Sequence, residues 1–151
     1  MWISTKAQYG MRALVEVALG GAEPTSLKTV ADRQGLSHQY LEQIFAHLRR
    51  AGIVESVRGA HGGYRVARPL DEVPALEVVE LLEGSVAPVT CIDDEGTCQR
   101  VGHCSTETLW RRVDAAVREV LGATSLADLV AQRRILNLEP LPEAEALGRV
   151  N

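Results

Sequence analysis

Aromatic residues make up only 4% of this 151-residue chain, while hydrophobic residues as a whole make up 46%. A core can therefore form, but it must be mainly aliphatic. No run of about eighteen apolar residues occurs, which argues against a membrane span, and the opening residues MWISTKAQYG lack the apolar stretch of a secretory signal. These absences predict a cytoplasmic protein that has one domain, or one small domain with an added arm.

Cysteine is equally scarce, since the chain has three and all lie in the segment CIDDEGTCQRVGHC, residues 91–104. An odd number argues against a closed set of disulfides, and cytosolic thiols are kept reduced. The sequence also lacks a glycine fingerprint for nucleotides, a nucleophile elbow and a recognisable acid/base pair. We therefore do not expect an enzyme, and the cysteines point to metal binding or redox sensing.

Basic residues are few in the second half of the chain. Residues 71–151 contain seven Lys and Arg against fifteen Asp and Glu, whereas residues 1–70 contain nine against five. The net charge of −4 thus conceals a basic first half and a strongly acidic second half. Such asymmetry indicates two tasks, with the basic half facing a polyanion.

Residues 1–70 carry the pattern of a winged helix-turn-helix DNA-binding domain. A first amphipathic helix is expected within residues 4–21, with its apolar residues at helical spacing. Ser26 is expected to cap a second helix, and Ser37 a third. Gly35 between them makes the tight turn of the motif.

The third helix presents hydrogen-bonding side chains early on its outer side, at the end that enters a major groove. These are His38, Gln39, Tyr40, Glu42 and Gln43. Residues 53–57 and 64–67 alternate as strands, and the turn between them completes a wing whose tip carries Arg58 and His61. An ordinary hairpin with solvated charges is the alternative for the wing. In this order and in a basic segment, the elements predict binding of double-stranded DNA.

Residues 71–135 are predicted to form an arm outside the DNA-binding domain. A short helix ends at Gly84, the cysteine segment follows, and a long helix runs from after Cys104 to Gly122. Its apolar stripe consists of Leu109, Val113, Ala116, Val117 and Val120. A partner subunit is the natural cover for this stripe, so we expect a homodimer, with packing onto the chain's own helices as the alternative. One more short helix follows, and residues 136–151 are expected to be a disordered tail.

The spacing of the three cysteines favours an iron–sulfur cluster. Three thiolates can take three corners of a metal or cluster site, and two glycines let the backbone turn so that the sulfurs converge. A zinc site usually pairs cysteines two to four residues apart, and this segment has no such pair. Zinc and unligated thiols stay open as alternatives. The neighbouring acids Asp93, Asp94 and Glu95 are expected to raise the thiol pKa values and so to disfavour a redox switch.

The fourth ligand is open on the residues alone. Glu107 lies three residues after Cys104, and residues three apart share a helix face, so both could reach one iron. His103 is the competitor, because imidazole is the commoner ligand, although it would tend to point away from its neighbour Cys104. A group from a partner subunit is a third option.

A known family matches these features. The segment LSHQYLEQIFAHLRRAGIVESVRGAHGGYRVARP, followed by three cysteines and by LW at the start of a long helix, resembles the IscR-like regulators. These are dimeric winged-helix transcription factors, with relatives named RirA and NsrR. The resemblance covers about residues 1–135, and its most specific parts are YLEQIF, VRGAHGGY and the three-cysteine segment.

The resemblance implies an iron–sulfur cluster held by Cys91, Cys98 and Cys104, with 2Fe-2S as the first choice and 4Fe-4S as the second. It also implies that the helix from Ser37 reads the DNA site. Gln39, Tyr40, Glu42 and Gln43 would then lie at the major groove, and Arg58 with Gly59 at the wing contact. Close relatives place a histidine where this chain has Glu107, and others use a carboxylate of the partner's first helix, near the place of Gln8.

We therefore interpret the chain as mainly α-helical with a small β-wing, a winged helix-turn-helix domain followed by a long dimerisation helix. Its expected function is that of a cytoplasmic, homodimeric repressor that senses iron–sulfur status through its own cluster. One alternative is a zinc- or thiol-based regulator that responds to nitric oxide, redox stress or cysteine supply. Another, of a different class, is an electron-transfer protein.

Overall fold

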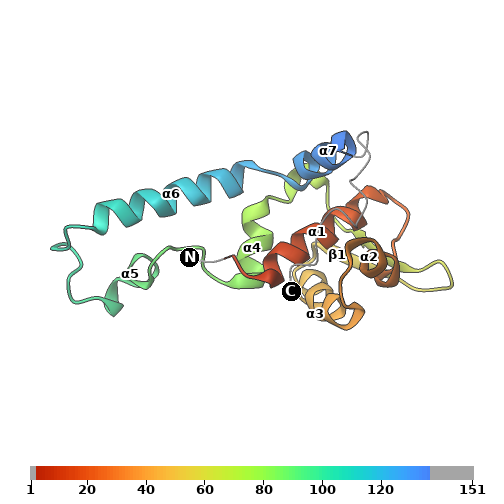
Figure 1. Cartoon of the computed structure of the whole chain (residues 1–151), viewed down its shortest axis with the longest axis horizontal. Coiled ribbons are helices and arrows are strands. Elements are labelled where there is room, and N and C mark those ends of the chain that lie inside the picture. The colour runs from red at the N-terminus through yellow and green to blue at the C-terminus, as the bar shows by residue number, and fades with distance from the viewer. Residues whose placement is uncertain (1–2, 137–151) are drawn as a thin grey trace, which may run out of the picture.

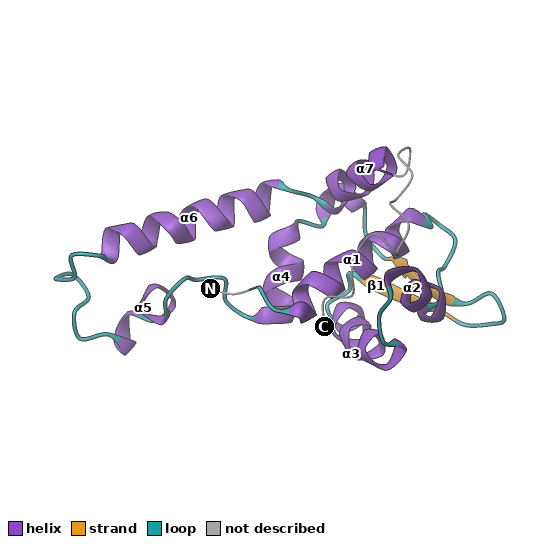
Figure 2. Cartoon of the chain, viewed as in Figure 1, coloured by secondary structure: helices purple, strands orange, loops and turns teal. Residues whose placement is uncertain are grey.

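The computed structural model describes residues 3–136. Its helices and strands form a compact part and an arm that projects from it (Figure 1). The compact part contains α1 (Thr5–Leu19), α2 (Leu27–Gln34), α3 (His38–Arg50), β1 (Val54–Val57), β2 (Gly63–Val66), η1 (Leu70–Glu72), α4 (Ala75–Glu83) and α7 (Leu126–Leu136). The arm contains α5 (Thr90–Asp93), η2 (Glu95–Thr97) and α6 (Glu107–Ala123). Helices dominate and the two strands are short (Figure 2), which confirms the predicted fold class.

The helix-turn-helix is built by side-chain caps and one left-handed glycine. The Ser26 hydroxyl accepts a hydrogen bond from the backbone N–H of Thr29, and the Ser37 hydroxyl accepts one from that of Tyr40. Such caps satisfy N–H groups that the first helical turn leaves without partners. Gly35 ends α2 with φ of 64°, a conformation that costs glycine little. The three sequence signals therefore mark the start of α2, the turn and the start of α3 as predicted.

The wing is the antiparallel pair of β1 and β2, with Val54 opposite Val66 and Val57 opposite Gly63. A further bridge joins Thr25 to Tyr64 and ties the wing to the start of the helix-turn-helix. A Cβ at Gly63 would collide with the Thr25 backbone, so this close approach requires glycine.

The core is aliphatic around one phenylalanine. Phe45, Leu14, Leu41 and Ile44 are fully buried, and the ring of Phe45 lies 5.1 Å from that of Tyr64. The same core includes residues of α4 and α7, which follow residue 70 in the sequence. The predicted domain boundaries at residues 70 and 135 stay predictions, but the acidic half contributes to the core of the compact part.

Glu16 is the one charged residue that the described chain buries, at 3% exposure. Its carboxylate accepts a hydrogen bond from the Gln34 amide at 2.9 Å and lies 3.3 Å from Arg133 and 3.7 Å from Arg33. A buried carboxylate is tolerated only with such partners. The contacts connect α1 to the end of α2 and to α7, the helix that follows the arm.

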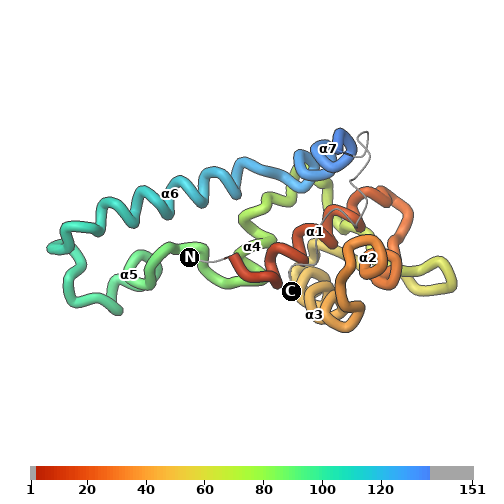
Figure 3. The backbone as a smooth tube through the Cα atoms, viewed as in Figure 1, coloured from red at the N-terminus to blue at the C-terminus, as the bar shows by residue number. Residues whose placement is uncertain are grey.

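The helix α7 returns the chain from the arm to the compact part (Figure 3). Ser125 caps it, donating to and accepting from Asp128, and Leu126 donates a backbone hydrogen bond to Val73 at 2.8 Å. Leu136 still belongs to α7. The remainder of the tail that was predicted to be disordered, residues 137–151, lies outside the described residues.

Candidate nucleic-acid interface and cysteine loop

The first turns of α3 expose the side chains that the sequence assigns to a major groove. His38 and Glu42 are 51% and 58% exposed, and Gln39 and Gln43 are also exposed. The His38 ring nitrogen lies 3.7 Å from the Glu42 carboxylate, one helical turn away. Ser37, which caps the helix, is exposed beside them. Polar groups that can donate and accept therefore occupy one exposed helix end.

Tyr40 differs from its neighbours because its ring is half-buried. It packs edge-on against Tyr9 of α1, with ring centroids 6.4 Å apart. The Arg12 guanidinium lies 5.6 Å from the Tyr9 ring and donates hydrogen bonds to the side chain and backbone carbonyls of Gln34. Tyr40 therefore helps to fix α3 against α1 and α2 in addition to lying at the predicted groove surface.

The tip of the wing carries Arg58, Gly59 and His61, all exposed, as the sequence predicts. Gly59 has φ of 121°, which side-chain-bearing residues rarely adopt. Below the tip, Arg65 and Glu55 face each other across the strands and form an ion pair at 2.6 Å. Arg58 has no such partner among the described residues, so its charge is available to a polyanion.

The three cysteines lie along the arm and not in the compact part. Cys91 is in α5, Cys98 ends η2, and Cys104 precedes α6. All three are half-buried and none is in a disulfide. Within residues 3–136, however, no group of three or more His, Cys, Asp and Glu side chains is arranged to hold a metal ion. The donors share one segment, but their sulfurs have not converged.

The environment of Cys104 differs from the expectation that nearby acids raise the thiol pKa. Its Sγ lies 3.3 Å from the Thr106 hydroxyl. Hydrogen bonds from the Thr106 hydroxyl and then from the Thr106 backbone N–H lower the pKa of the Cys104 thiol below its ordinary value. Oriented donors at the start of α6 thus outweigh the opposing effect of the Glu107 carboxylate, and the expectation was wrong for this cysteine.

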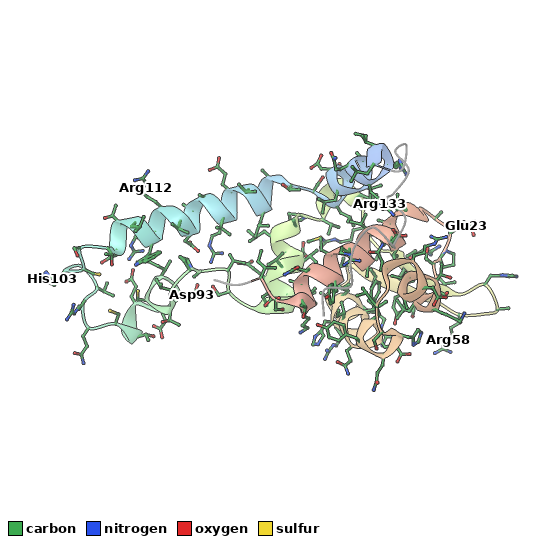
Figure 4. The ribbon with its side chains drawn as sticks, in the orientation of Figure 1. Glu23, Arg58, Asp93, His103, Arg112 and Arg133 are labelled. Carbon is green, nitrogen blue, oxygen red and sulfur yellow. The ribbon has the colours of Figure 1, made fainter. Side chains whose placement is uncertain are left out.

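Glu107 already has partners in this loop. Its carboxylate accepts hydrogen bonds from the backbone N–H of Gly102 at 2.8 Å and from Arg111 at 2.9 Å. The Gly102 bond and then the Arg111 bond hold the pKa of Glu107 below its ordinary value. Arg111 also binds Glu95 at 2.9 Å, so the three charged side chains connect η2 to α6. His103, the competing ligand, is exposed at the tip of the arm (Figure 4).

A second arginine fixes the base of the arm. Arg118 of α6 lies 2.9 Å from Asp114, 2.7 Å from Glu80 of α4 and 3.8 Å from Asp93 of α5. Arg111 and Arg118 were not among the predicted site residues. The pairs Glu107 with Arg111 and Asp114 with Arg118 both have the four-residue spacing of helical ion pairs, so these two pairs could have been predicted from the sequence. Their contacts with Glu95, Glu80 and Asp93 depend on the return path of the loop.

The helix α6 buries no residue, although an apolar stripe runs along it. Leu109 and Val120 are 51% and 66% exposed, against the usual burial of such side chains. An open apolar groove lies beside the stripe and is lined by Ile3, Ala116, Val117, Val120 and Leu121. The alternative that the stripe packs onto the chain's own helices is therefore not realised along its length.

The fold and its attached arm define a class of protein. A helix-turn-helix with an exposed polar third helix, followed by a two-stranded wing, is a winged-helix regulator fold. No described helix is long and apolar enough to span a membrane.

A family model described as "Rrf2: Iron-dependent Transcriptional regulator" matches residues 3–132. The chain thus belongs to the Rrf2 family and is a transcriptional regulator of its IscR-like type, which confirms the resemblance read from the sequence. The transcriptional regulator CymR of Bacillus subtilis is 42% identical over 87% of this chain and 91% of its own length. IscR of Xenorhabdus nematophila is 37% identical over 91% of this chain and 84% of its own length.

Two solved structures extend the comparison to three dimensions. The structure of CymR, the global cysteine regulator of B. subtilis, superposes with a TM-score of 0.75 at 41% identity and covers 87% of this chain and 98% of its own. That of IscR from T. potens gives 0.72 at 35% identity, with 97% and 96% covered. The relatives are named as regulators and not as enzymes. CymR, however, is named as a cysteine regulator, whereas the other relatives described above are named IscR.

Proposed function

We propose that the chain is a homodimeric repressor that binds a double-stranded DNA operator and senses iron–sulfur status through a cluster on its arm. The observation that carries this proposal is that all three cysteines of the chain, each free of disulfides, lie on one arm of an Rrf2-family regulator. In Figure 4 the wing residue Arg58 and the arm residue His103 lie at opposite ends of the molecule. Sensing and DNA reading therefore occupy separate sites in one chain.

The DNA site consists of the exposed start of α3 and the wing tip. Gln39, Tyr40, Glu42 and Gln43 follow Ser37 and His38 into the major groove, where hydrogen-bonding side chains distinguish base pairs. Arg58, Gly59 and His61 reach the backbone or the minor groove from the wing. A basic first half favours this binding through the phosphate charges.

The donor set of the arm fits an iron–sulfur cluster by its chemistry. Cys91, Cys98 and Cys104 supply thiolates, the ligands that such clusters use. Glu107 is the proposed fourth ligand, but it must first release Gly102 and Arg111. A bound 2Fe-2S cluster, or a 4Fe-4S cluster as second choice, would join Cys91, Cys98 and Cys104 by a crosslink that is sensitive to redox state and iron supply. The loop must close to bring the sulfurs together.

The exposed stripe of α6 favours association with a second copy of the chain. Leu109 and Val120 remain exposed at the arm, and regulators of this kind bind paired half-sites as dimers. Because Glu107 begins the same helix, closure of the cysteine loop can alter the spacing of two DNA-binding parts. Sedimentation of the purified chain tests this step, and a monomer at micromolar concentration would contradict it.

The sensing step couples ligand binding at the arm to DNA binding by the dimer. Whatever binds the arm more tightly in one conformation shifts the dimer toward that conformation. If DNA also prefers one conformation, the arm ligand changes DNA affinity by the same factor by which DNA changes the arm's affinity for that ligand. Arg118 is placed to transmit the change, because it connects α6 and α5 of the arm to α4 of the compact part.

A second candidate is a thiol-based regulator that answers cysteine supply or redox stress. Two observations favour it, namely the lowered pKa of the Cys104 thiol and the similarity to CymR. A lowered pKa increases the thiolate fraction, which is the reactive form. In this alternative Cys104 would be modified and no metal would be needed.

One DNA-binding experiment separates these functions. Duplexes are first selected from a random-sequence pool, and affinity is then measured anaerobically for the iron-loaded and the iron-free protein. We expect a difference of about 5- to 150-fold, the usual range of such couplings. Equal affinities, together with a response to thiol oxidation, would support the thiol regulator. Absence of DNA binding in every state would support the electron-transfer class.

A further inference from the structure

Of the nine Lys and Arg side chains in residues 3–70, four have a carboxylate partner within the described chain and five do not. In residues 3–70, Lys28, Arg33, Arg65 and Arg68 each lie within 4.0 Å of a carboxylate. Among the described residues without one, Arg12 is hydrogen-bonded to Gln34 and Arg58 lies at the wing tip, which leaves Lys6, Arg49 and Arg50. These three belong to the start of α1 and the end of α3, two helices that pack together (Figure 1).

Arg50 is held in place by two hydrogen bonds. Its Nε donates to the Ala46 carbonyl at 3.2 Å, and its Nη2 lies 3.0 Å from Nδ1 of His47. Because a guanidinium can only donate, Nδ1 accepts and the ring proton of His47 is on Nε2. His47 and Arg50 therefore each keep an N–H donor for a further acceptor.

Lys6 lies in the first turn of α1, the helix that packs against α3, and its charge acts on the same histidine. Burial, then Lys6 and then Arg50 lower the pKa of His47, which keeps the ring neutral and its Nδ1 free to accept. The acid at this end of α1 is Glu83, whose carboxylate accepts from the backbone N–H groups of Ser4 and Ala7. It caps the helix and makes no ion pair with Lys6 in the described structure.

Helix stability alone explains Arg50 but not Lys6. A cation at the C-terminal end of α3 complements the helix dipole, whereas Lys6 lies in the first turn of α1, where the dipole disfavours positive charge. No acidic residue occupies that first turn. A lysine at this position, beside a preorganised arginine and a histidine donor, is suited to an external anion.

We infer that Lys6, His47 and Arg50 form a phosphate-binding site that holds the DNA backbone at the end of α3 opposite to the base-reading end. The inference rests on the proposed DNA binding and adds a third contact to the groove helix and the wing. The 13 residues of α3 span about 20 Å, whereas phosphates of one strand follow about every 3.4 Å along the duplex axis. The site therefore lies several phosphate spacings from the base-reading end of α3. His47 acts here as a positioning residue and hydrogen-bond donor.

The test measures how binding to a random-sequence duplex depends on salt. The double variant Lys6→Gln/Arg50→Gln is compared with the unmodified protein, and the slope of log affinity against log salt should fall by about 0.9 for each phosphate that the variant no longer neutralises. Arg112→Gln is the matched control, because Arg112 is exposed on α6, away from α3 (Figure 4). It removes the same charge per substitution and should leave the slope unchanged.

The possible outcomes distinguish failure of the phosphate site from failure of the proposed DNA binding. If the unmodified protein binds no duplex, the DNA-binding function itself fails. If it binds and the double variant keeps the same slope, or changes it no more than Arg112→Gln does, the phosphate site is wrong. Lys6→Gln alone serves where the double variant does not fold, with a proportionately smaller change. His47→Leu should weaken binding with little change in slope, since it removes a donor but no charge.

Discussion

The carboxylate of Glu107 accepts a hydrogen bond from the backbone N–H of Gly102 at 2.8 Å, two residues before Cys104. The contact closes residues 102–107, which include Cys104, onto the first turn of α6. The residue proposed as the fourth ligand is therefore also the side chain that holds this part of the loop against α6. Ligand exchange at Glu107 would then couple occupancy of the arm to its shape.

The Gly102 contact should weaken in acid. The folded-state pKa of Glu107 lies below the ordinary 4.5, so the contact contributes fully above that pH and is lost as pH falls through the lowered pKa. We expect the Gly102 amide NMR signal to move with a midpoint below 4.5 in metal-free protein. Glu107→Gln keeps an acceptor but cannot ionise, so its Gly102 signal should not titrate there. A midpoint at or above 4.5 would contradict the contact.

Each cysteine should be essential for the cluster but not for folding. Cys91→Ala, Cys98→Ala and Cys104→Ala should abolish bound iron, while circular dichroism and the unfolding midpoint stay close to those of the unmodified protein. The reason is that none of the three belongs to the buried core. A variant that keeps full iron content shows that its cysteine is not a ligand.

The fourth ligand is tested by a pair of variants in the same loop. Glu107→Ala should leave a labile cluster that loses iron quickly to a chelator, because the change removes both a ligand and the acceptor of the Gly102 hydrogen bond. His103→Ala, at the exposed tip, should lose iron at the normal rate. The reverse result would assign the ligand to His103, and no effect of either would favour a group from the partner subunit.

Glu42 and Arg58 should affect DNA binding in different ways. A bare acid near phosphates is repelled, so Glu42 is useful only if it accepts a hydrogen bond from a cytosine amino group. Glu42→Ala should therefore lose about 1–3 kcal/mol of discrimination at one base position while keeping affinity for other sites. Arg58→Ala should weaken binding to all sequences and flatten its salt dependence.

Affinities for single-base operator variants at two salt concentrations measure both effects. If Glu42→Ala loses affinity equally for every operator, Glu42 has a structural role and does not read a base. Its charged neighbour in the fold is then His38, at 3.7 Å.

Glu16 should be important for stability. Replacing it with Ala removes the buried acceptor of Gln34 and the carboxylate that lies 3.3 Å from Arg133, and we expect a loss of about 1–3 kcal/mol in the free energy of unfolding. The value is below that of a fully buried pair, because Arg33 is 59% exposed. The control Glu23→Ala, at an exposed position (Figure 4), should change it by less than about 0.5 kcal/mol. Urea unfolding compares the two, and equal effects would contradict the role of Glu16.

The compact part was predictable because its signals are local. Ser26, Gly35 and Ser37 mark the helix-turn-helix through caps and a turn that need only neighbouring residues. The apolar period along α6 likewise predicted a long helix with an uncovered stripe. Local chemistry thus determined the type and order of these elements.

The cysteine arm was less predictable because its geometry depends on distant contacts. Nothing near Cys91 indicated the short helix α5, and the partners of Arg118 come from three separate elements. The pKa of Cys104 follows from how Thr106 is oriented and not from the charge of nearby residues. The cation cluster of Lys6 and Arg50 could not be predicted either, because its members are far apart in the sequence.

The most direct test of the account is the content of iron and acid-labile sulfide in protein purified without oxygen. The account predicts a brown protein with iron and sulfide in near-equal amounts per chain, and loss of both in Cys98→Ala. Stoichiometric zinc without sulfide, or a colourless protein that contains no metal after anaerobic purification, would contradict it.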